Sequence, residues 1–99
     1  MNNANVAANM DAIRKLGQQV QSQSAEYNGE TKKIYASVDQ LEQAWTGADN
    51  QTYIGKVKEQ RQTIEDLGKV IDNFGIFLVD TANNLQKVQD EIKAQAGKL

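Results

Sequence analysis

The feature that most constrains this chain is a spacing of mostly apolar residues that alternates between three and four positions. Before the middle of the chain, the series is Met10, Ile13, Gly17, Val20, Ser24, Tyr27, Thr31, Ile34, Val38, Leu41 and Trp45. After it, the series is Tyr53, Val57, Gln60, Ile64, Leu67, Ile71, Phe74, Leu78, Thr81, Leu85, Val88 and Ile92. Steps that average 3.5 residues keep one seam along one side of an α-helix. The chain contains no proline, so nothing in it forces a long helix to break.

The two series are separated by Trp45-Thr46-Gly47. Glycine takes backbone conformations that other residues reach only at a cost, which suits a helix end and a reversal of the chain. We therefore predict one all-α domain over residues 1–99, an antiparallel helix-turn-helix hairpin. The first helix should cover about 5–44, the turn 45–47 and the second helix about 48–95. Asn28-Gly29 would elsewhere suggest a turn, but the spacing keeps its phase across it, so we expect one helix there.

The series predicts which side chains join the two helices of the hairpin. The expected hairpin seam is Ile13, Val20, Ile34, Val38 and Leu41 from the first helix, with Ile64, Leu67, Ile71, Leu78 and Leu85 from the second. Gly17, Ser24 and Thr31 are small and recur every seven residues, and Gly68 and Gly75 share a face of the second helix. We expect these small residues to let the neighbouring helix approach closely.

Two helices side by side enclose no side chain from all directions, and the apolar surface near Phe74 is wider than one seam. The residues that suggest a second layer are Val70, Phe74, Ile76, Phe77 and Val79. We therefore expect hairpins to dimerise into a four-helix bundle. A homodimer is the expected form, and a heterodimer with a related hairpin is the alternative.

Composition excludes several function classes. The chain has no cysteine and no histidine, which removes disulfides, thiol nucleophiles, imidazole catalysis and the usual zinc sites. The adjacent acidic pairs Glu65-Asp66 and Asp90-Glu91 diverge by about 100° around a helix. We expect no enzyme activity, cofactor or metal site. A net charge of −2 argues against nucleic-acid binding, and the longest apolar run, residues 76–79, is too short to span a bilayer.

The central Trp45-x-Gly47 between two long amphipathic segments resembles the WXG family, hundred-residue ESAT-like proteins of type VII secretion in actinobacteria and firmicutes. The resemblance covers the whole chain. It implies helical hairpins that pair, and export through a membrane-embedded ATPase after synthesis in the bacterial cytoplasm. Membrane contact is expected only through that machine. It also implies secretion without a cleavable signal peptide, in keeping with an N-terminus that lacks the pattern of one. Trp45, Thr46 and Gly47 are the expected turn and secretion motif.

One departure from the family pattern concerns the C-terminal Tyr-x-x-x-Asp/Glu signal. No tyrosine follows Tyr53, and Leu85-x-x-x-Gln89 stands near the expected place. Two functions therefore stay open. The chain is either a small secreted substrate or co-substrate that pairs with itself and engages the secretion ATPase, or a targeting partner that covers a larger exported helical effector. Trp45 could serve recognition or simply join the two helices.

Overall fold

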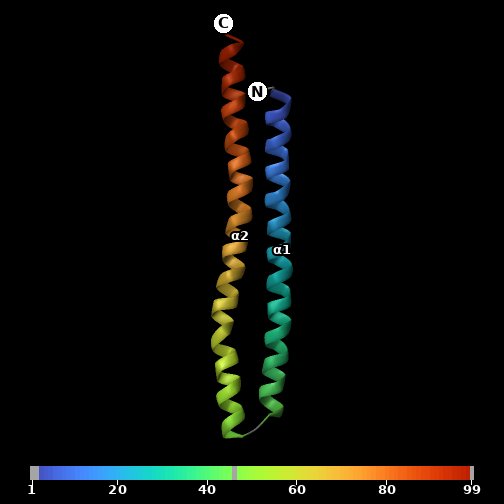
Figure 1. Ribbon diagram of the computed structural model, residues 1–99, viewed down its shortest axis with the longest axis vertical. Coiled ribbons are helices and arrows are strands. Elements are labelled where there is room, and N and C mark those ends of the chain that lie inside the picture. Colours follow the sequence, from blue (N-terminus) through green and yellow to red (C-terminus); the bar gives the residue numbers. More distant parts are fainter. Residues whose placement is uncertain (1–2, 46, 99) are drawn as a thin grey trace.

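The computed structural model describes residues 3–45 and 47–98 and contains two helices, α1 (Asn3–Ala44) and α2 (Ala48–Ala96). The helices lie side by side in opposite directions and form a rod measuring 79 × 17 × 15 Å (Figure 1). The described residues contain no strand. The predicted all-α helical hairpin is confirmed, and α1 runs through Asn28-Gly29 without a break.

The turn depends on one glycine. The Trp45 amide donates to the Leu41 carbonyl at 2.8 Å and so closes the last turn of α1, while the Gln51 amide donates to the Gly47 carbonyl at 3.0 Å and opens α2. Gly47 has φ 138° and ψ 146°, a combination that essentially only glycine adopts. The predicted glycine-dependent reversal is therefore present, and Thr46 lies outside the described residues.

Small residues form the line of contact between the helices. A Cβ on Gly75 would lie 2.9 Å from the Gly17 carbonyl oxygen, and one on Gly17 would lie 2.8 Å from the Gly75 carbonyl oxygen. A Cβ on Gly68 would collide with the Asn28 side chain. Ser24 is buried beside Gly68. The close approach expected at these glycines is confirmed, and it brings the two backbones together.

The buried core is small, as a two-helix rod requires. Among the described residues, the buried side chains other than glycine are Met10, Ser24, Thr31, Tyr35, Ile54 and Ala82. They follow the same contact line as the glycines. The total accessible surface is 7458 Å², whereas a compact monomer of 11.0 kDa is expected to expose about 5,600 Å². The hairpin alone therefore exposes far more surface than its mass requires.

Candidate partner-binding face

Most of the large apolar side chains of α2 point away from α1. We call the following nine residues, each between 44% and 62% exposed, the α2 stripe: Tyr53, Val57, Leu67, Val70, Phe74, Phe77, Leu85, Val88 and Ile92. Single exposed apolar residues are ordinary on a protein surface. A row of nine along one helix is different, because monomeric proteins rarely expose a continuous apolar patch of this length.

α1 adds three exposed apolar residues to the same side of the hairpin, Leu16, Ile34 and Leu41. Leu16 precedes the contact residue Gly17, as Phe74 precedes Gly75. Both helices are right-handed and run in opposite directions, so the residue just before a contact residue points to the same side in each. We call the α2 stripe together with these three residues the outer face.

Hydroxyl groups of α1 fix the rotation of α2 that creates the outer face. Tyr27 Oη donates to the Ile64 carbonyl at 2.9 Å, and Ser24 Oγ donates to the Gly68 carbonyl at 3.0 Å. Tyr35 Oη donates to the Val57 carbonyl at 3.3 Å. Each bond ties α1 to the α2 backbone rather than to an α2 side chain. Tyr27 belongs to the alternating series of α1, but the spacing did not predict these hydrogen bonds. The signal for them in the sequence was the presence of hydroxyl residues among the small ones of that series.

Charged groups tie the helices together near both ends of the rod. At the turn end, Lys58 Nζ lies 2.8 Å from Glu42 Oε2, and this hydrogen bond and charge raise the pKa of the Lys58 ammonium. At the open end, the Arg14 guanidinium donates to Asn83 and Gln86 of α2 at 3.1 and 2.7 Å. These contacts keep the two helices in one axial register.

The structure divides the expected hairpin seam between two environments. Half-buried between the helices are Ile13, Val20, Val38, Ile64, Ile71 and Leu78, whereas Ile34, Leu41, Leu67 and Leu85 are exposed. The physical reason is that the contact line of α2 runs through Ile54, Gly68, Gly75 and Ala82, one position after the alternating series. A shift of one residue rotates a helix by about 100°. The series on α2 therefore points largely outward.

The five residues expected at a partner interface also separate. Val70, Phe74 and Phe77 lie on the outer face. Val79 is half-buried and packs at the hairpin contact, where its Cγ2 would lie 2.8 Å from a Cβ on Gly17. Ile76 is 39% exposed and points about 200° around the helix from Phe74, on the other side of the hairpin. Among the described residues, no other exposed large apolar side chain lies beside Ile76 on that side.

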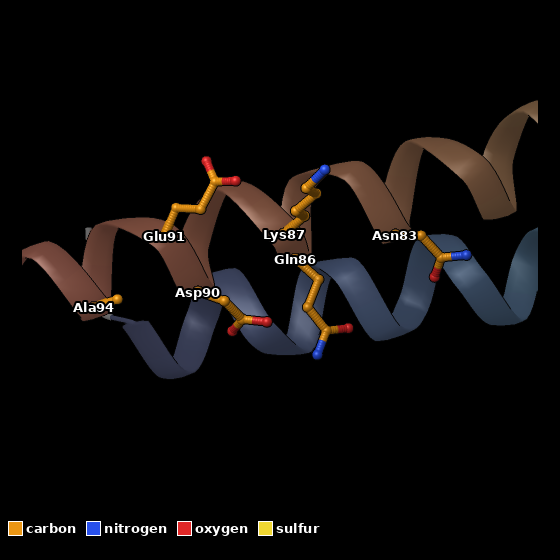
Figure 2. Close-up of a pocket in the computed structure, with 6 residues that line it drawn as sticks. All are labelled: Asn83, Gln86, Lys87, Asp90, Glu91 and Ala94. Carbon is orange, nitrogen blue, oxygen red and sulfur yellow. The ribbon is translucent and has the colours of Figure 1, made fainter.

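Two further surface features lie at the two ends of the rod. Trp45, in the turn motif with Gly47, is 39% exposed at one end of the rod. At the other end, a shallow groove is lined by Asn83, Gln86, Lys87, Asp90, Glu91 and Ala94 (Figure 2). In Figure 2 the Lys87 and Glu91 side chains point away from α1, whereas the Gln86 and Asp90 side chains extend across the α1 ribbon in this view. The groove is open, its lining residues other than Ala94 are polar or charged, and none of them is a large apolar anchor.

The described residues contain no group of His, Cys, Asp or Glu side chains that could hold a metal ion. Within the same part of the chain, no helix is long and apolar enough to cross a membrane. An outer face of aliphatic and aromatic side chains on a rod held together by small residues is what a helix-pairing protein needs. Fold and face together define a helical hairpin with a large apolar surface that the hairpin itself does not cover.

Comparison with known proteins gives the family. Residues 5–91 match WXG100, described as proteins of 100 residues with WXG, and the chain belongs to that family. A solved structure with the same fold is Geobacillus thermodenitrificans EsxA, crystal form I, with 20% identity and a TM-score of 0.75. The match covers 88% of this chain and 97% of that one. No curated protein matches.

Membership of this family makes the chain a small helical substrate of the type VII secretion class. Proteins of the family are exported without signal peptides. They typically form helical dimers.

Proposed function

We propose that this chain is a type VII secretion substrate that is exported as a self-paired four-helix bundle. The secretion ATPase recognises it partly through the turn at Trp45 and Gly47. The observation that supports pairing is the outer face, whose apolar residues the hairpin itself does not cover. The accessible surface of 7458 Å² exceeds the expected value by about 1,800 Å². A standard interface buries about 800 Å² on each partner, so the surplus is ample for a stable pair.

The position of Trp45 supports a role in recognition. Its indole lies at the end of the rod, partly exposed, beside a glycine whose backbone conformation fixes the turn. Aromatic residues that are partly buried and end in a polar group are common anchors in protein interfaces. Trp45→Ala should reduce export while helicity, read by circular dichroism, and dimerisation stay unchanged. Loss of the helical fold in this variant would instead assign Trp45 a packing role.

The test of pairing compares two exposed apolar residues of one helix. Phe74→Glu places a charge in the middle of the outer face, so sedimentation should show a monomer and export from the native cell should fall. Ile76→Glu is the matched control, because Ile76 is exposed on the other side, and both properties should stay unchanged. Normal export of a monomeric Phe74→Glu variant would refute the proposal.

The alternative is a targeting partner for a larger exported effector. A purified wild-type chain that stays monomeric at micromolar concentration and becomes stably folded only with such an effector would support it. That result would overturn self-pairing.

A further inference from the structure

We propose that Asn28-Gly29 is a site of spontaneous deamidation that the helical fold keeps unreactive, so that the chain is modified there only while the middle of α1 is open. The reaction depends on neither export nor pairing. These two residues favour a turn by sequence, yet the structure places them inside a helix. Asn28 is the only asparagine of the chain that is followed by glycine.

Gly29 has no packing role in the hairpin. A Cβ on Gly17, Gly68 or Gly75 would collide with atoms of the other helix, and Gly47 has a positive φ. A Cβ on Gly29 would meet nothing within 4 Å, although glycine inside a helix costs stability relative to alanine. The fold therefore tolerates glycine at this position without requiring it. What glycine changes here is the chemistry of the residue before it.

Deamidation at this pair is an intramolecular exchange of bonds. The Gly29 backbone nitrogen loses its proton and attacks Cγ of Asn28, which closes a succinimide ring; the bond from Cγ to the side-chain nitrogen breaks, and ammonia leaves. Water then opens the ring at one of its carbonyls and produces aspartate or iso-aspartate. Glycine favours the attack because no Cβ hinders its nitrogen. Gly55 is equally open but follows Ile54, which has no amide to react.

The helical backbone keeps the two reacting atoms apart. α1 is continuous from Asn3 to Ala44, so Asn28 has a ψ of about −42° and the Gly29 amide donates to the carbonyl four residues earlier. Ring closure needs a ψ well away from this value and a nitrogen free of that hydrogen bond. The side chain is also held, because Asn28 Oδ1 lies where a Cβ on Gly68 would be. The amide is therefore packed against α2.

Exclusion of water does not account for this protection. Asn28 is exposed and lines a surface pocket with Thr31, Lys32, Glu65 and Lys69. Water therefore reaches the amide while the chain is folded. Because only the conformation of α1 blocks the reaction, the rate should follow the fraction of chains in which this part of the helix is open.

Iso-aspartate at position 28 would prevent α1 from re-forming. Its main chain runs through the side-chain carbon and is one atom longer, which shifts the two halves of α1 relative to each other. The hydrogen bond from Ser24 to Gly68 lies on one side of position 28. The bond from Tyr35 to Val57 lies on the other side. One continuous helix could no longer form both.

Aspartate at position 28 should be tolerated. It keeps the normal backbone and places a carboxylate four residues before Lys32, an order that supports a helix. The isomer rather than the new charge is therefore the damaging product. A chain that remains open loses the ability to return to the hairpin, whereas a chain whose α1 stays helical keeps Asn28.

Peptide mapping by mass spectrometry tests the protection. The wild-type chain is incubated at neutral pH without denaturant and in guanidinium chloride, and iso-aspartate at position 28 is measured over time. The folded chain should react at least about tenfold more slowly. Gly29→Ala in guanidinium chloride is the matched control, because it keeps Asn28 and adds a Cβ beside the attacking nitrogen. It should react about tenfold more slowly than the wild-type chain in the same solvent.

Tyr27→Phe tests whether the reaction passes through opening of α1. The variant loses the hydrogen bond to the Ile64 carbonyl, one residue before Asn28. Without denaturant it should therefore deamidate about fivefold faster than the wild-type chain. In guanidinium chloride the two chains should react equally fast. Equal rates without denaturant, in a variant of lowered stability, would overturn control by the fold.

The refolding of the products tests the consequence. Chains with iso-aspartate at position 28, separated by chromatography, should fail to regain wild-type helicity and Tm, whereas Asn28→Asp should regain both. Wild-type refolding of the iso-aspartate form, or loss of helicity in Asn28→Asp, would overturn the role of the isomer. Equal deamidation of folded and unfolded wild-type chains would overturn the proposal, as would an Asn28 that reacts no faster than Asn73 or Asn84 in guanidinium chloride. None of these results bears on pairing or export.

Discussion

Gly75 gives the sharpest test of how the hairpin is held together. Gly75→Ala adds one methyl group where the backbones meet, 2.9 Å from the Gly17 carbonyl oxygen and 3.0 Å from the Gln21 amide nitrogen. Both atoms belong to the backbone of α1, so the methyl group fits only if the helices move apart. Overpacking of this kind costs about 1–3 kcal/mol, whereas alanine in a helix gains about 1 kcal/mol over glycine.

The net expectation for Gly75→Ala is a loss of about 1 kcal/mol in the free energy of unfolding. Gly29→Ala is the matched control, since a Cβ there meets nothing within 4 Å. It should gain about 1 kcal/mol from helix propensity alone. For a domain of this size, each change corresponds to about 4–8 °C in Tm, with opposite signs.

Thermal and urea unfolding followed by circular dichroism measures both variants. The protein concentration must be equal, because pairing stabilises the folded state by mass action. If Gly75→Ala raised Tm as much as Gly29→Ala, the close backbone contact would not exist and the contact line would have to be redrawn.

Three further changes test other contacts of the hairpin. Tyr27→Phe removes a hydrogen bond to the α2 backbone and should cost about 1 kcal/mol in urea unfolding; an unchanged midpoint would show that the hydroxyl contributes nothing. Gly47→Val should destabilise by about 1–3 kcal/mol, because its φ of 138° is strained for any other residue; an unaltered Tm would contradict that conformation. Glu42 raises the pKa of the Lys58 ammonium above its ordinary value of 10.5, so the stabilisation is complete below about pH 10.5 and is lost as the pH rises through the folded pKa. Compared with Lys58→Arg, which stays charged, the wild-type chain should lose stability above that pH, and parallel pH profiles would refute the assignment.

Much of the fold follows from local sequence. Alternating spacing, the absence of proline and the Trp45-x-Gly47 break predict two long helices and one reversal, and the structure has both. The recurrence of Gly17 with Ser24 and of Gly68 with Gly75 also predicts close approach of the helices. These features depend on backbone preferences and spacing along one helix, which a sequence displays directly.

The candidate site was harder to predict. Phe74 and Val70 were expected at a partner interface and lie on the outer face, but Ile76 lies on the opposite side and Val79 packs at Gly17. Leu67 and Leu85 were expected between the helices and point outward. Each helix has an apolar surface wider than one contact line, so spacing alone does not say which part faces the other helix.

What the sequence determined by itself is a helical hairpin with an apolar surface too large for its own core. The tertiary structure decided how each helix is rotated. Backbone contact at Gly17 and Gly75, with hydroxyl bonds from Ser24 and Tyr27 to α2 carbonyls, requires small and polar residues on the inside. The bulky side chains of the α2 stripe are left outside because only a close approach of the backbones satisfies those contacts.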